Sequence, residues 1–100
     1  GMDVPDTVTE AVQFLQLEGF VNDFPLDGSG MRCGSCRHVH RPEELTIRYT
    51  FRFEGATDPA DEAIVLGVVC PKCGAGGTIV SAYGVDADPA YVELIQRLIQ

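Results

Sequence analysis

The chain has 100 residues, and its seven Lys and Arg face fifteen Asp and Glu, which leaves a formal charge of −8 at pH 7. This length is typical of one domain, and 45% hydrophobic with 22% charged residues excludes a disordered polymer. The negative charge disfavours binding to a phosphate backbone. We therefore expect a single acidic domain over residues 1–100.

Targeting signals are absent from the sequence. Gly1 before Met2 looks like a remnant of tag cleavage. No apolar run is long enough to span a membrane, and no signal peptide is visible. These features predict a cytoplasmic protein without membrane contact.

The first predicted element is a helix that begins after Thr7. Thr7 and Glu10 form a capping box, and Gly19 supplies the C-terminal stop. Apolar residues at helical spacing give it one core-facing stripe: Val8, Ala11, Val12, Phe14 and Leu15. A polar turn region over residues 22–30 then leads to a short strand at Met31-Arg32.

Two cysteine couplets dominate the centre of the sequence. Each C-x-x-C corner turns tightly enough for both sulfurs to face one ion, and two such corners complete a tetrahedron. This spacing predicts one structural Zn²⁺ with four ligands: Cys33, Cys36, Cys70 and Cys73. Basic residues beside the couplets should favour the thiolate form.

Other interpretations of the couplets remain open. A redox dithiol or disulfide, an iron site of the rubredoxin type, and simply buried thiols are all compatible with C-x-x-C spacing. Against iron, the chain has no Trp, and Arg37 stands where a glycine usually follows the first couplet.

Three strands and a second helix complete the prediction. Residues 45–54 alternate between apolar and polar, residues 63–70 are apolar on both faces, and residues 78–83 form a third strand. Asp88-Pro89 begins a helix with a buried stripe up to Ile99. The fold class is α+β, an antiparallel sheet of three to four strands with two zinc knuckles, flanked by an N-terminal and a C-terminal helix.

The predicted strand over residues 63–70, which is apolar on both faces, also suggests a binding partner. If both helices share one face of the sheet, Ile64, Leu66 and Val68 on the other face need cover from residues 20–31 or from a second molecule. We expect an unknown protein partner or a homodimer at that face.

Six of the seven Lys and Arg lie between positions 32 and 72. This asymmetry supports an alternative function, a nucleic-acid-binding domain, whose candidate contacts surround the knuckles: Arg32, Arg37, His38, His40, Arg41 and Lys72. Because these charges also balance an anionic metal site, we regard nucleic acid as the weaker interpretation.

No nucleophile is paired with a base in a recognisable pattern, and a zinc closed by four sulfurs cannot activate water. We therefore expect a non-enzymatic protein. One cluster leaves a cryptic enzyme open, because it can be read as an active site or as a turn-stabilising ion-pair set: Arg52, Glu54, Asp58 and Asp61.

The two couplets and their flanking strands resemble a zinc ribbon. A longer pattern includes Gly19-Phe20, Arg52-Phe53-Glu54-Gly55, Asp58-Pro59 and Ala82-Tyr83-Gly84. In this respect the chain is similar to a family of small uncharacterised bacterial proteins, some of which are labelled phosphoribosylpyrophosphate synthetase. The resemblance implies fold and length. It does not imply that activity, which needs a larger scaffold with pyrophosphate and ATP–magnesium sites, and the cysteines would mark a metal-bearing branch.

Overall fold

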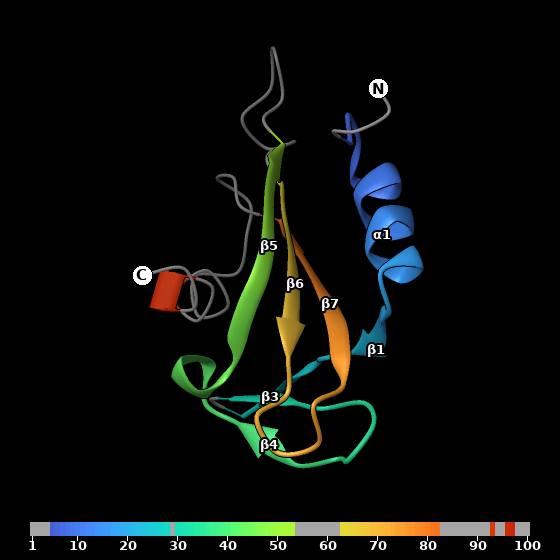
Figure 1. Ribbon diagram of the computed structural model, residues 1–100. Helices are drawn as coiled ribbons and strands as arrows, with labels where there is room; N and C mark the ends of the chain where they lie inside the picture. The colour runs from blue at the N-terminus through green and yellow to red at the C-terminus, as the bar shows by residue number, and fades with distance from the viewer. Residues whose placement is uncertain (1–4, 29, 54–62, 83–92, 94–95, 98–100) are drawn as a thin grey trace.

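The computed structural model describes residues 5–28, 30–53, 63–82, 93 and 96–97 (Figure 1). The elements follow one another in this order: α1 (Val8–Leu17), β1 (Phe20–Asp23), β2 (Leu26–Asp27), β3 (Gly30–Arg32), β4 (Val39–His40), the 3₁₀ turn η1 (Pro42–Glu44), β5 (Thr46–Phe53), β6 (Ala63–Val69) and β7 (Gly76–Ala82).

The strands form two sheets. The larger has the order β1-β7-β6-β5, and the smaller is the antiparallel sheet β2-β3-β4. The predicted α+β class and the antiparallel run β5-β6-β7 are confirmed. The purely antiparallel sheet is wrong, because β1 joins the edge of β7 in parallel. The predicted turn region over residues 22–30 begins too early, because residues 22 and 23 belong to the edge strand β1, which follows the helix directly.

Helix α1 begins and ends where its capping residues predict. The Thr7 hydroxyl accepts a hydrogen bond from the Glu10 backbone N–H at 3.1 Å. The Glu10 carboxylate accepts from the Asp6 N–H at 2.7 Å, one residue before the cap. After the helix, Gly19 has a φ of +98°, a conformation that disfavours any side chain and ends the helix.

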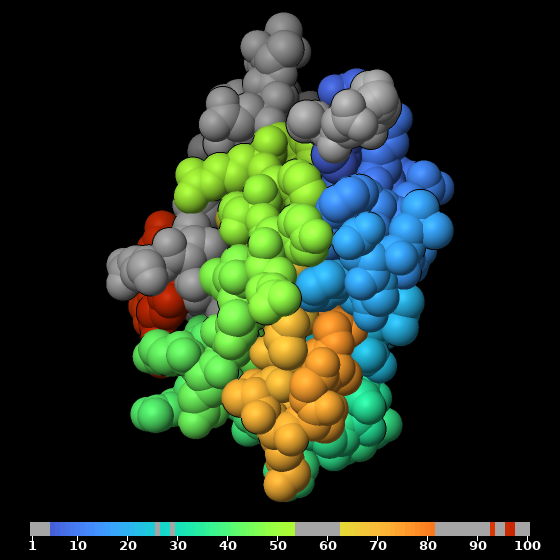
Figure 2. All heavy atoms as spheres, viewed as in Figure 1, coloured from blue at the N-terminus to red at the C-terminus, as the bar shows by residue number. Residues whose placement is uncertain are grey.

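The helix covers one face of the large sheet and makes the smaller of two cores. Ala11 and Leu15 lie against Val65 of β6 with no exposed surface. The Phe14 ring meets Tyr49 and Phe51 edge to face, with ring centroids 5.3 and 5.9 Å apart. Helix α1 runs along this face in Figure 1, and in Figure 2 its side chains lie against those of β5.

The second core fills the other side of β6 and continues into the small sheet. Its buried members come from both sheets: Phe24, Met31, Cys33, Leu45, Ile64, Leu66, Val68, Cys70 and Ile79. The prediction that β6 is covered on both sides is confirmed, since Ile64, Leu66 and Val68 have no exposed surface within one chain. These three residues therefore offer no apolar surface to a second molecule.

Strand β5 serves both cores because its register shifts. Ile47 lies opposite Val68, and Tyr49 lies opposite Gly67, so one extra residue is accommodated between them. The exposed and half-buried residues alternate along β5 as predicted. The apolar residues of this alternation do not share one core, because Ile47 packs in the second core while Tyr49 packs against the helix.

The predicted C-terminal helix falls on residues of which the structure describes only Glu93, Gln96 and Arg97, so it lies outside the described part. Arg97 forms a two-pronged ion pair with Glu43 of η1, with nitrogen–oxygen distances of 2.6 to 3.2 Å. The Arg97 guanidinium lowers the pKa of the Glu43 carboxyl. Within the described residues, no helix has the length and apolar character needed to cross a membrane.

Replacing Gly77 with Ala should destabilise the fold. A Cβ here would overlap the Phe24 ring and lie 2.6 Å from the backbone oxygen of Asn22. Such overpacking costs about 1–3 kcal/mol, which urea unfolding of the purified variant would measure. The control is Gln13→Ala on the exposed side of α1. Equal stability of the two variants would contradict the packing of β1 against β7.

Candidate metal centre

The four cysteines lie in two turns, one in each sheet. Cys33 and Cys36 stand between β3 and β4 in the small sheet, and Cys70 and Cys73 stand between β6 and β7 in the large one. Both turns lie at the same end of the molecule, below the large sheet in Figure 1.

The first knuckle is closed by its own backbone and held by β1. The Cys33 N–H donates to the His38 carbonyl, and the Arg37 N–H donates to the Cys33 carbonyl, both at 2.9 Å. The Gly34 N–H donates to the Asp23 carbonyl at 2.9 Å, and a Cβ at Gly34 would lie 2.8 Å from that oxygen. Only glycine allows this close approach, which anchors the knuckle to the end of β1.

The second knuckle repeats the same backbone pattern. The Cys70 N–H donates to the Ala75 carbonyl at 2.9 Å, and the Gly74 N–H donates to the Cys70 carbonyl at 3.0 Å. The backbone N–H groups of Lys72 and Cys73 also point at the Cys70 sulfur, at 3.4 and 3.5 Å. Amides aimed at a sulfur stabilise its thiolate form.

The four sulfurs meet at one point. Cys33 Sγ lies 3.7 Å from Cys73 Sγ, Cys36 Sγ lies 3.7 Å from Cys70 Sγ, and all four lie within 4.8 Å of one another. Zn–S bonds of about 2.3 Å in a tetrahedron place neighbouring sulfurs about 3.8 Å apart. The sulfur set therefore suits one structural Zn²⁺. A disulfide needs about 2.05 Å, and all four thiols are free, so the disulfide interpretation does not describe this structure.

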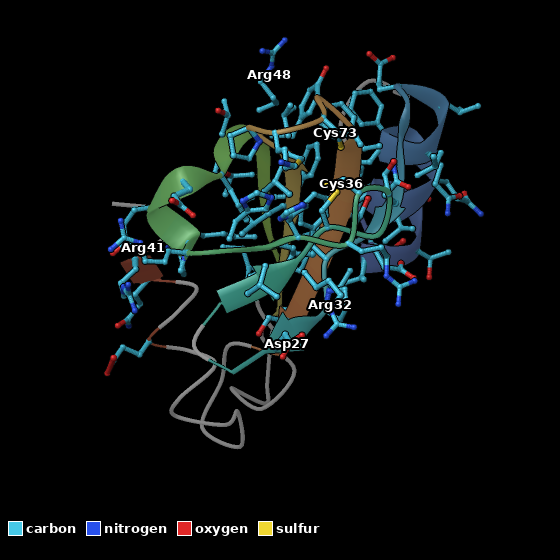
Figure 3. The ribbon with its side chains drawn as sticks, turned by 90° about the horizontal axis from the view of Figure 1, so that it is seen from below. Asp27, Arg32, Cys36, Arg41, Arg48 and Cys73 are labelled. Atoms are coloured by element: carbon cyan, nitrogen blue, oxygen red, sulfur yellow. The ribbon has the colours of Figure 1, made fainter. Side chains whose placement is uncertain are left out.

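The ligands differ in their access to solvent. Cys33 and Cys70 are 0% and 1% exposed and belong to the second core. Cys36 is half-buried and Cys73 is exposed. The second knuckle forms the lower tip of the surface in Figure 2, and Cys36 and Cys73 approach each other in Figure 3.

The pKa values of Cys36 and Cys73 differ. A hydrogen bond from the Ala75 backbone, together with those to the other cysteines, lowers the pKa of Cys73 to about 7. The His38 backbone lowers the pKa of Cys36, but burial and contacts with three other cysteines outweigh it and raise the value to about 11. Binding of Zn²⁺ therefore has to displace protons, which makes metal affinity dependent on pH.

His40 is the functional residue that the sequence interpretation placed wrongly. A candidate nucleic-acid contact should be exposed, yet His40 is only 8% exposed, and its Nε2 lies 3.2 Å from Cys70 Sγ. The pairing of β4 with β3 turns it inward. No local signal in the sequence separates it from His38, which is exposed.

The remaining basic candidates differ in their surroundings. Arg32 is ion-paired with Asp27, while Arg37, Arg41 and Lys72 are exposed. Figure 3 shows Arg32 and Arg41 well apart, on different sides of the metal centre. Of the other cluster, Arg52 lies on β5, and Glu54, Asp58 and Asp61 lie outside the described residues.

Comparisons with protein-family models, with curated proteins and with solved structures find no match for this chain. The family resemblance drawn from the sequence thus stays a prediction. The residues themselves support a four-cysteine site that suits zinc within a small α+β domain.

The two knuckles differ at the residue after the second cysteine, and this difference can be tested. Arg37 has a φ of +70° and Gly74 a φ of +78°. Because a side chain is strained in this region, Arg37→Gly should stabilise the protein by about 1 kcal/mol and Gly74→Ala should destabilise it by a similar amount. Thermal unfolding in excess zinc measures both.

Arg37→Ala is the matched control, since it removes the charge and keeps the backbone strain. If Arg37→Ala stabilised the protein as much as Arg37→Gly, charge rather than backbone conformation would be responsible.

Proposed function

We propose that this chain is a small acidic domain built around a structural Zn²⁺ and that it acts by contact with other proteins. The observation that carries the zinc assignment is the meeting of four sulfurs within 4.8 Å at the junction of two sheets. Four thiolates complete the tetrahedral coordination of zinc.

A structural role follows from the donor set. A catalytic zinc keeps one position open for water or substrate, whereas four cysteines leave none. The buried His40 contacts a ligand sulfur instead of an open cavity. Both features support a non-enzymatic domain.

The metal would join two parts of the fold that also share the second core. The small sheet contributes Cys33 and Cys36, and strands β6 and β7 border Cys70 and Cys73. Metal binding adds its free energy to the docking of the two sheets, because the site exists only when both knuckles are in place.

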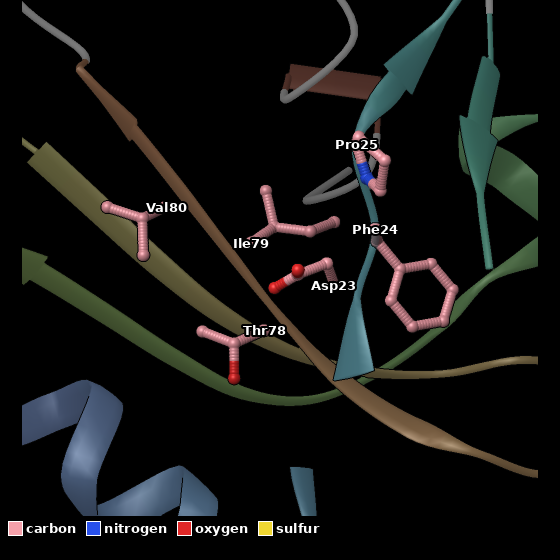
Figure 4. Close-up of a pocket in the computed structure, with 6 residues that line it drawn as sticks. All are labelled: Asp23, Phe24, Pro25, Thr78, Ile79 and Val80. Carbon is pink, nitrogen blue, oxygen red and sulfur yellow. The ribbon is translucent and has the colours of Figure 1, made fainter. Parts of the chain in front are cut away.

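A groove beside the end of β1 supports contact with a protein. The pairing of β1 with β7 ends at Asp23 and Thr78, and among the described residues no strand continues along Ile79–Ala82 on that side. A groove of about 330 Å³ opens there, lined by Pro25, Ile79 and the half-exposed Val80 (Figure 4). A groove with apolar side chains beside a β-strand suits an extended peptide.

Nucleic acid is the less supported partner. The formal charge is −8, Arg32 is already paired with Asp27, and Arg32 and Arg41 lie on different sides of the metal centre (Figure 3). A phosphate backbone is recognised by a continuous basic surface, which these positions do not make.

The purified protein should contain one zinc per chain and little iron by elemental analysis. Cys73→Ser should lose most of the metal and cost several kcal/mol of stability, because metal affinity is folding energy in such sites. Cys73 is chosen because it is exposed, so serine leaves the core packing intact.

Ser35→Ala in the first knuckle is the control, since Ser35 is exposed and offers no ligand to the metal. It should keep its zinc. Iron in place of zinc, or an unchanged metal content in Cys73→Ser, would remove the zinc assignment.

Capture of partners from cell extract distinguishes contact with a protein from contact with nucleic acid. Binding should survive nuclease treatment, persist with the double variant Arg37→Ala/Arg41→Ala, and weaken with Val80→Arg in the groove. The reverse pattern, loss with nuclease and with the arginine variant only, would favour nucleic acid.

A further inference from the structure

A buried imidazole lies against one of the four sulfurs. His40 Nε2 is 3.2 Å from Cys70 Sγ, a distance at which an N–H donates to sulfur. The residue is only 8% exposed, and no buried side-chain nitrogen or oxygen of the described residues lacks a hydrogen-bond partner. The contact is therefore part of the packed interior.

The fold holds this ring in place from the backbone. His40 pairs with Met31 across the small sheet, and its carbonyl presses on Gly30, where a Cβ would lie 2.6 Å from that oxygen. A side chain at Gly30 would push β4, and with it the imidazole, away from the metal centre.

The far side of the ring faces a carboxylate. Glu44 Oε1 lies 3.9 Å from His40 Nδ1 and accepts a hydrogen bond from the Arg41 N–H at 2.8 Å. The η1 turn thus sets the carboxylate behind the imidazole. At 3.9 Å the two atoms are too far apart for a hydrogen bond, so Glu44 does not require the proton on Nδ1, and the tautomer with Nε2–H facing the sulfur is open to the ring.

His40 is not itself a metal ligand here. The ligand atoms that lie mutually within 4.8 Å are the four sulfurs, and the imidazole nitrogen is not among them. With the tetrahedron already complete, the ring can act only through the sulfur that it contacts.

Cys70 has a particular need for such a donor. The residue is 1% exposed, so in the zinc-bound form water could not offset the negative charge of its thiolate as it could for the exposed Cys73. The backbone N–H groups of Lys72 and Cys73 approach the Cys70 sulfur at long distances of 3.4 and 3.5 Å, whereas His40 approaches to 3.2 Å.

We propose that His40 is a positioning residue of the zinc centre, which donates its Nε2–H to Cys70 Sγ and thereby slows the loss of the metal. This inference rests on the proposed zinc function. The hydrogen bond draws negative charge from the buried thiolate, lowers its reactivity, and ties β4 to the second knuckle.

Release of zinc to a colorimetric chelator tests the proposal. His40→Ala should release zinc about 10- to 100-fold faster than the unaltered protein, the range typical for loss of such an outer partner. His40→Gln, whose amide N–H can still donate, should recover part of this loss. His38→Ala is the matched control, because His38 is exposed and its ring lies 6.5 Å from that of His40.

A spectroscopic measurement on the unaltered sequence covers the case in which His40→Ala fails to fold. In protein loaded with ¹¹³Cd, the ¹H–¹⁵N spectrum of His40 should show a proton on Nε2 with scalar coupling to the metal through Cys70 Sγ. An Nε2 without a proton, or without coupling, would overturn the proposal.

Two different results separate failure of the zinc assignment from failure of the role of His40. If the unaltered protein holds no zinc, the proposed function fails. If it holds zinc but His40→Ala and His38→Ala release the metal at the same rate, only the role of His40 fails.

Discussion

The fold depends on one point of contact, where turns from two sheets bring four sulfurs together. The small sheet β2-β3-β4 has strands of only two or three residues, which is too little to be stable alone. Its buried residues Met31 and Cys33 belong to the core that also contains Cys70. Apolar packing and metal coordination thus act on the same junction, and the loss of either weakens the other.

That junction concentrates negative charge in an apolar environment. Four thiolates and one Zn²⁺ carry about −2 together, and a buried charge is costly unless it is hydrogen-bonded. Here the compensation comes from backbone amides and from His40, whereas the exposed Arg37 and Lys72 lie in water.

The sequence predicted the parts of this structure that rest on local or periodic signals. Thr7 and Gly19 marked the ends of the helix, the couplets marked the metal site, and the β5 alternation matched its exposure pattern.

The errors concern contacts between distant residues. Nothing near Phe20 signals that β1 will pair with β7, more than fifty residues later, since a short edge strand has no periodicity of its own. The sequence around Tyr49 also carries no signal for the register shift, because the shift is defined by pairing with β6. His40 looked exposed among polar neighbours, and only the pairing of β4 with β3 turns it inward.

The four cysteines differ in exposure, so the metal centre is covered on one side and open to solvent on the other. Cys33 and Cys70 are sealed in the core, and Cys73 faces solvent. With Zn²⁺ bound, Cys73 would be the ligand most accessible to solvent, so a thiol reagent or chelator would reach the centre from that side, while Cys33 and Cys70 would stay covered by the core.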